Sequence, residues 1–262
     1  LQPLLNSGAI SMEHIDNAVR NVLRTKFMSG MLDNYPSPLA APEDAEHQAL
    51  VLEAGRKALV LLKNEGDILP LNPTTITKIA LIGPSANKAQ LDGFGSSWVE
   101  PNYTVSPRQG IANIIGASKI DYVQGCEINS NNESGFAAAK QAAEGADVVI
   151  FVGGLDDTQE GEGYGDRPEY DRKGGKIELP GKQQKLINEL ATVNDKVIVV
   201  LKSGGICAVN ESIDNMKGLI YAFYPGQEGG NAIAEALFGG YNPGGKLPVT
   251  LPKNTGQLPE WN

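Results

Sequence analysis

Short runs of apolar residues alternate with helical patterns along the chain from about residue 78. A run of consecutive apolar and β-branched residues is typical of a strand buried on both faces of a parallel sheet. Such runs predict strands at 78–83, 120–126, 146–154, 196–205 and 217–226. Helices are predicted between or after them at 135–146, 179–193 and 228–240. The alternation predicts an α/β fold with a mainly parallel sheet sandwiched by helices.

The first part of the chain has a separate helical pattern. Ser11 can cap a helix at residues 11–29, and Gly30 can end it. Its apolar positions recur at helical spacing and form one stripe: Ile15, Val19, Val22, Leu23 and Phe27. Such a stripe must be buried against a partner surface. After a proline-rich segment at 34–42, a second helix is predicted at about 43–58.

Four of the predicted strands run directly into glycine. Their ends read KIALIGPSA, VIFVGG, VVLKSGG and YAFYPGQEGG. In an open α/β sheet, ligands bind at the carboxyl ends of the strands, and glycine lets the backbone turn sharply there. We therefore expect a ligand-binding rim at this edge of the sheet.

The acidic loop, Gln159–Arg167 (QEGEGYGDR), follows the third predicted strand and places Glu160 and Glu162 among three glycines. A carboxylic acid on a loop at that edge is placed to hand over a proton. Asp166 and Arg167 can fix the loop by ion pairing. A solvated acidic turn is the simpler interpretation, and these residues alone leave both open.

Composition and charge exclude several classes of function. The net charge of -9, with no basic stretch to offset it, argues against nucleic acid as a partner. Cys126 and Cys207 cannot form a disulfide framework, and no CxxC spacing indicates zinc. The sequence has neither GxGxxG nor a phosphate-loop motif, so no metal or cofactor is expected. No apolar run is long enough to span a membrane, and no membrane partner is expected.

Seven motifs occur in one order along the chain: LLKNEGDILPL, IALIGPSA, GFGSSW, QEGEGYGDR, ELPGKQQKLI, VVLKSGG and YPGQEGGNAIAEALFGGYNPGGKLPVTLP. The ordered set, from about residue 5 to residue 258, resembles glycoside hydrolase family 3 of the β-glucosidase and β-xylosidase type. In that family a (β/α)₈ barrel carries the catalytic nucleophile, an Asp. An α/β sandwich domain follows the barrel and supplies the acid/base carboxylate on a loop.

The resemblance implies a division of the chain into the last helical part of a barrel, a linker, an (α/β)₆ sandwich domain and an extended tail towards a further domain. The corresponding residues are 1–33, 34–42, 43–250 and 251–262. The barrel's nucleophile motif is absent from the sequence. The chain is therefore expected to be part of a larger enzyme, with the missing barrel portion as its partner, and to carry one half of the active site.

The resemblance also implies roles for the loop carboxylates. The family's acid/base Glu lies just before an Asp-Arg pair, so Glu162 is expected to be the general acid/base. Glu160 is the alternate, because Gly165 is inserted before the Asp-Arg pair and leaves the register open.

Three residues are expected to bind substrate. Ser96 matches a loop position that contacts sugar in some relatives. Trp98 and Tyr164 lie in polar, glycine-containing loops, where an aromatic ring can stack on the apolar face of a sugar. Local packing is the alternative for Trp98.

The expected substrate is a β-linked oligosaccharide or glycoside, hydrolysed at its non-reducing end by a retaining exo-β-glycosidase, with β-glucosidase as the first choice. A β-xylosidase or arabinosidase of the same family is the alternative, since acid/base loops there often read EAEG. A non-catalytic carbohydrate-binding α/β domain stays open as an alternative of another class. The resemblance also favours a periplasmic or secreted protein and allows a homodimer.

Overall fold

The structure is a computed structural model that describes residues 1–33, 45–89, 91, 98–160 and 176–259. The chain divides into two units, Leu1–Asp44 and Ala45–Asn262, which are described separately. The linker expected at 34–42 lies outside the described residues. The boundaries implied by the family resemblance stay predictions.

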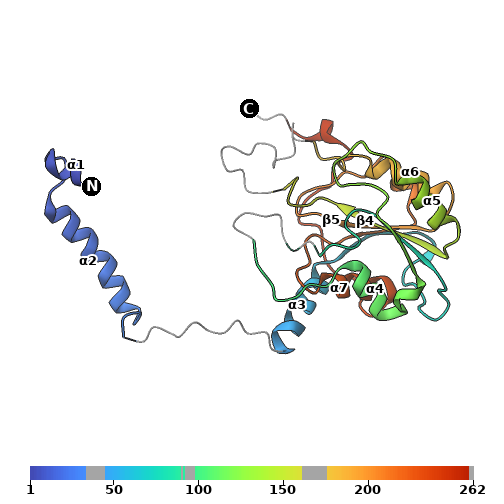
Figure 1. The fold of residues 1–262 in the computed structure, drawn as a ribbon, viewed down its shortest axis with the longest axis horizontal. Helices are drawn as coiled ribbons and strands as arrows, with labels where there is room; N and C mark the ends of the chain where they lie inside the picture. Colours follow the sequence, from blue (N-terminus) through green and yellow to red (C-terminus); the bar gives the residue numbers. More distant parts are fainter. Residues whose placement is uncertain (34–44, 90, 92–97, 161–175, 260–262) are drawn as a thin grey trace. The chain divides into compact units, whose positions relative to one another are not determined.

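The larger unit is built on a six-stranded sheet with the order β1-β6-β5-β4-β2-β3 (Figure 1). Its strands are β1 Val60–Asn64, β2 Ile79–Ile82, β3 Ile120–Val123, β4 Val148–Gly154, β5 Val197–Lys202 and β6 Gly218–Tyr221. All neighbouring pairs are parallel except β1 and β6, which are antiparallel. The prediction of a mainly parallel sheet is confirmed.

Helices cover both faces of this sheet (Figure 1). On one face lie α3 Ala45–Ala58, α4 Pro107–Ile115 and α7 Gly229–Phe238, and on the other lie α5 Phe136–Glu144 and α6 Gln183–Ala191. Val149 and Phe151 of β4 pack in the core beneath α5 and α6, whereas Ile150 and Val152 pack in the core beneath α4 and α7. Successive residues of a strand point to opposite faces, so burial on both faces requires an uninterrupted apolar run.

One strand and one α-helix of this unit were not predicted. The β1 segment mixes apolar residues with Lys63 and Asn64, and its pairing with β6 shifts register between Leu61 and Lys63. An irregular, half-buried edge strand carries little period-two signal. The helix α4 begins after Ser106, whose side chain accepts a hydrogen bond from Gln109 N, with Pro107 in its first turn. This Ser-Pro pair was the sequence signal from which the helix could have been predicted.

The strand order has a topological switch point at the carboxyl ends of β2 and β4, because β3 lies on one side of β2 and β4 on the other. Ligands bind at such switch points in open α/β sheets. Gly83 follows β2 with a φ of +118°, and a Cβ there would lie 2.2 Å from the Val152 carbonyl oxygen. Ser85 N donates to the same oxygen at 3.1 Å. Glycine therefore allows the two strand ends to approach closely.

The smaller unit contains α1 Gln2–Asn6 and α2 Met12–Met28. Ser11 caps α2 as expected, since its side chain accepts from His14 N and the His14 ring contacts the Ser11 backbone. No residue of α2 is buried, and Val19, Val22 and Phe27 of the apolar stripe are exposed. Within this unit, therefore, nothing covers the stripe.

Candidate active site

The acidic loop is entered through a turn directly after β4. Asp156 is buried, and its Oδ1 accepts from Thr158 N at 3.0 Å and from Thr158 Oγ1 at 2.5 Å. Its carbonyl oxygen accepts from Gln159 N at 2.9 Å and Glu160 N at 3.0 Å. The Asp156 side chain and backbone together fold the turn that delivers Glu160 to the rim of the sheet.

Glu160 is held by three donors from the neighbouring strand ends. Gly204 N donates to its Oε2 at 2.9 Å, and Gly205 N donates to its Oε1 at 2.5 Å. The Tyr224 hydroxyl also donates to Oε2. Burial, followed by the charge of Glu160, raises the pKa of Tyr224 well above its usual range. These three donors tie the Glu160 side chain to the ends of β5 and β6, so the carboxylate is placed to anchor the loop.

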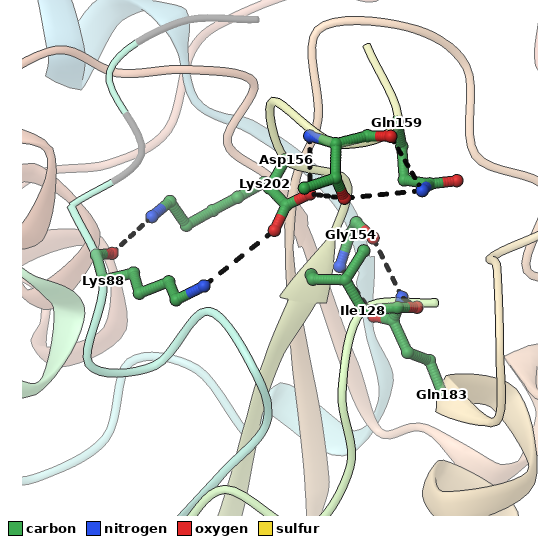
Figure 2. A network of polar contacts seen from close by, with 8 residues as sticks. Lys88, Ile128, Gly154, Asp156, Gln159, Gln183 and Lys202 are labelled. Atoms are coloured by element: carbon green, nitrogen blue, oxygen red, sulfur yellow. Dashed lines mark hydrogen bonds and ion pairs between the residues drawn. The ribbon is translucent and has the colours of Figure 1, made fainter. Parts of the chain in front are cut away.

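Lysine side chains join three strand ends close to this turn (Figure 2). Lys202, the last residue of β5, is 1% exposed, and its Nζ donates to the Lys88 carbonyl oxygen at 2.6 Å. The Lys88 Nζ lies 3.9 Å from Oδ2 of Asp156. Burial lowers the pKa of Lys202 to about 7, and the nearby charge of Lys88 adds to this effect.

Gln183 supports the end of β4 from the start of α6 (Figure 2). Its side chain is fully buried, and its Oε1 accepts from Gly154 N at 2.8 Å. Its Nε2 donates to the carbonyl oxygens of Gly154 at 2.9 Å and Ile128 at 3.0 Å. A buried amide with partners on both ends orders the backbone from which the acidic loop departs.

The segment that carries Trp98 is held at the start of α7. Trp98 is 59% exposed, so its ring does not serve as core packing. Tyr103 OH donates to Oε1 of buried Glu228 at 2.5 Å, and Asn231 Nδ2 donates to Oε2 of the same carboxylate at 2.6 Å. Val105 N donates to the Gln227 carbonyl oxygen at 2.8 Å, which fixes the end of the segment.

The structure thus brings Glu160 to the rim, next to Gly204, Gly205 and Tyr224, and it leaves Trp98 exposed. The other expected site residues, Ser96, Glu162 and Tyr164, lie outside the described residues. Sequence reasoning missed Tyr224, Lys202 and Lys88. The position of Lys202 at the end of an otherwise apolar strand was the only signal for that residue.

Residues 59–262 match the family model of the glycosyl hydrolase family 3 C-terminal domain. The chain belongs to glycosyl hydrolase family 3. The family resemblance of the ordered motifs is therefore confirmed, and the rim described above is the carboxyl edge of a family 3 C-terminal domain.

Curated family 3 proteins match nearly the whole chain. A beta-xylosidase of Formosa agariphila is 33% identical over 261 residues, which are 95% of this chain and 35% of the relative. A periplasmic beta-glucosidase of Salmonella typhimurium is 32% identical over 292 residues, with 99% of this chain and 37% of the relative covered. The chain thus spans about a third of the length of the curated relatives it matches.

Solved family 3 structures have the same fold. The structure of a β-glucosidase from Erythrobacter marinus superposes with a TM-score of 0.83 at 29% identity, over 99% of this chain and 38% of that one. A β-glucosidase from Listeria innocua gives a TM-score of 0.83 at 27% identity, over 100% of this chain and 35% of that one.

Among the residues that the structure describes, His, Cys, Asp and Glu side chains do not gather in groups of three or more that could hold a metal ion. None of the described helices has both the length and the apolar character needed to cross a membrane.

Proposed function

We propose that this family 3 domain supplies the general acid/base of a retaining exo-β-glycosidase, and that Glu162 has this role. The observation that carries the proposal is the engagement of Glu160 with Gly204, Gly205 and Tyr224. A carboxylate held by three donors suits an anchor better than a group that must gain and lose a proton. Of the two glutamates on the loop, Glu162, two residues later, is then the one left for proton transfer.

Such a site works in two steps with a second carboxylate, which we expect from the barrel portion of the complete enzyme. In retaining glycosidases the two carboxyl groups lie about 5–5.5 Å apart. The nucleophile attacks the anomeric carbon while the bond to the leaving oxygen breaks and Glu162 gives that oxygen its proton. Glu162 then takes a proton from water, whose oxygen displaces the nucleophile from the anomeric carbon. Exclusion of water by the sugar and the barrel favours the neutral acid needed for the first step.

The proposed substrate is a β-linked oligosaccharide or glycoside with a terminal glucose. A terminal xylose is the second candidate, because the curated relatives include the beta-xylosidase of Formosa agariphila at 33% identity as well as the periplasmic beta-glucosidase of Salmonella typhimurium at 32%. Trp98 is proposed to stack on the bound sugar, since its ring is exposed and its segment is held at Gln227 and Glu228, in the connection between β6 and α7. Aryl β-glucosides and β-xylosides tested on the complete enzyme would identify the sugar.

The test of the acid/base role compares Glu162→Ala with Glu160→Ala in the complete enzyme. With Glu162→Ala, turnover of substrates with poor leaving groups should fall by roughly 10²–10⁴-fold, the range of general acid–base catalysis. Activated aryl glycosides need little protonation of the leaving oxygen, so the rate of their first step should fall less. Azide should restore the second step, because it attacks the covalent intermediate without a general base. Glu160→Ala is the matched control, with no azide rescue.

Azide rescue of Glu160→Ala and not of Glu162→Ala would move the role to Glu160. Rescue of neither variant, with both shown to be folded by circular dichroism, would remove the acidic loop from proton transfer.

A further inference from the structure

The Glu160 side chain sits in a small group of donors at the ends of β5 and β6, named here the carboxylate receptor. It consists of the backbone N–H groups of Gly204 and Gly205 and the hydroxyl group of Tyr224. Successive backbone N–H groups that point at one spot form a nest for anions. A Cβ at Gly204 would lie 2.9 Å from the Tyr224 ring and 3.3 Å from Oε2 of Glu160. Glycine therefore leaves room for the ring and the carboxylate side by side.

A buried tyrosine supports the receptor from the interior of the domain. Tyr221, the last residue of β6, is 1% exposed, and its hydroxyl group donates to the Gly205 carbonyl oxygen at 2.5 Å. The same hydroxyl oxygen accepts from Cys207 N at 3.1 Å. Buried Ser203 donates its hydroxyl hydrogen to the Gly205 carbonyl oxygen at 2.6 Å. The backbone of Gly205 is thus fixed by groups that do not belong to the acidic loop.

The backbone that leads to Tyr224 is strained. Phe223 has a φ of +51°, in the left-handed region that a bulky residue rarely adopts. Such a conformation persists only where the surrounding structure imposes it, and it is common at ligand-binding positions. The Phe223 ring packs on the Tyr221 ring with 4.8 Å between the ring centroids. Tyr224 follows directly, so this turn sets the direction in which its ring leaves the backbone.

We propose that the carboxylate receptor is a preformed binding site for a carboxylate group, and that Glu160 is the carboxylate which the chain itself supplies. The supports of the receptor, Tyr221, Ser203 and the turn at Phe223, lie on β5, β6 and the residues after them. A small free carboxylate should therefore bind there when the Glu160 side chain is removed. The inference concerns binding alone and does not depend on which glutamate transfers the proton.

The test uses Glu160→Ala in the complete enzyme with acetate as the probe. The substitution removes two carbons and two oxygens, which are the heavy atoms of one acetate ion. Acetate at about ten times its dissociation constant should raise the melting temperature of the variant by about 2 °C, because it binds the folded state alone. Sodium chloride at the same ionic strength and acetamide, which has nearly the same shape without the charge, should not. The wild type should not respond, because Glu160 fills the receptor.

A second substitution tests the support from Tyr221. Tyr221→Phe in the Glu160→Ala background removes the hydroxyl group that holds Gly205, and we expect the dissociation constant of acetate to rise about tenfold, in line with the loss of one hydrogen bond. Tyr241→Phe in the same background is the matched control, since Tyr241 lines a separate cavity beside β1. If Tyr221 had only a structural role, its substitution would lower the melting temperature and leave the dissociation constant unchanged, which would overturn its part in the proposal.

Equal effects of acetate, chloride and acetamide on Glu160→Ala would overturn the proposal. An acetate effect of the same size in the wild type would also overturn it, because the ion would then bind elsewhere. If Glu160→Ala does not fold, Glu160→Gly is measured with propionate, which replaces the removed atoms in the same way, and the same outcomes apply. A wild type that hydrolyses no glycoside would remove the proposed function, whereas the result with acetate would still decide this inference.

Discussion

Tyr224, which follows β6, donates its hydroxyl hydrogen to Oε2 of Glu160 on the turn that follows β4. The same carboxylate accepts the backbone N–H groups of Gly204 and Gly205 after β5. Loops from three parallel strands therefore meet on one side chain. This contact ties the start of the acidic loop to the rim of the sheet and gives Glu160 a role that its sequence position alone does not reveal.

Removal of this hydroxyl group should weaken the anchor without unfolding the domain. For Tyr224→Phe in the complete enzyme we expect kcat/KM to fall by roughly 10- to 100-fold, because a hydrogen bond to a charged group contributes about 1.5–3 kcal/mol. Steady-state kinetics on aryl glycosides measure the effect. Tyr241→Phe is the control, since Tyr241 lies beside Leu61 and Pro70 at the β1 edge of the sheet. Equal activity of Tyr224→Phe and the control would argue against an anchoring role for Glu160.

Truncation of Trp98 should affect sugar binding more than stability. Its ring is 59% exposed, so Trp98→Ala removes little packing. We expect KM in the complete enzyme to rise by roughly fivefold or more, since one aromatic contact contributes about 0.5–1.5 kcal/mol beyond the area it buries. Val99→Ala, at the exposed neighbouring residue, is the control for general disturbance of the segment. An unchanged KM for Trp98→Ala would show that the ring does not contact the bound sugar.

The buried amine of Lys202 should make stability depend on pH. Its folded-state pKa is lowered from 10.5 to about 7, chiefly by burial and further by the nearby charge of Lys88. Between about pH 7 and the unfolded-state pKa of about 10.4, the unfolded chain binds more protons than the folded chain. The free energy of unfolding contributed by this group should therefore rise with pH across that window.

The measurement is the melting temperature of the wild type, Lys202→Met and Lys196→Met from pH 7 to 9. The difference between the wild type and Lys202→Met should shift in favour of the wild type as pH rises. Lys196→Met should follow the wild type at each pH. A difference that stays constant with pH would mean that the amine keeps its ordinary pKa in the folded protein.

Close packing of α4 on α7 depends on a glycine. A Cβ at Gly110 would lie 2.0 Å from the Gly230 carbonyl oxygen, which is backbone and cannot rotate away. Gly110→Ala should therefore lower the free energy of unfolding by about 1–3 kcal/mol or more, the range for overpacking. Gly244→Ala is the matched control, because a Cβ there would meet no atom within 4 Å. Thermal unfolding that is the same for both variants would show that the two helices separate at little cost.

Much of the fold could be predicted from local patterns. Burial of β4 on both faces demands consecutive apolar residues, and Val148–Val152 meet that demand within a few residues of sequence. Alternation of such strands with helices favours parallel pairing, since a crossover helix returns the chain to the same edge. The ordered motifs identified the family. These signals lie within short stretches of chain, so they can be read without knowledge of the contacts.

The strand order and the contacts at the rim depend on the folded arrangement. The strand β1 pairs antiparallel with β6, which lies far away in the sequence. The mixed composition of β1 does not show which strand it pairs with. The donors to Glu160 come from loops after β5 and β6, and the buried amine of Lys202 finds its acceptor at Lys88, after β2. Periodicity reports which side of an element is buried and carries no information on which strand ends become neighbours. For that reason Glu160 reads in the sequence as a candidate acid, and its three donors become visible only when the parallel strands are placed side by side.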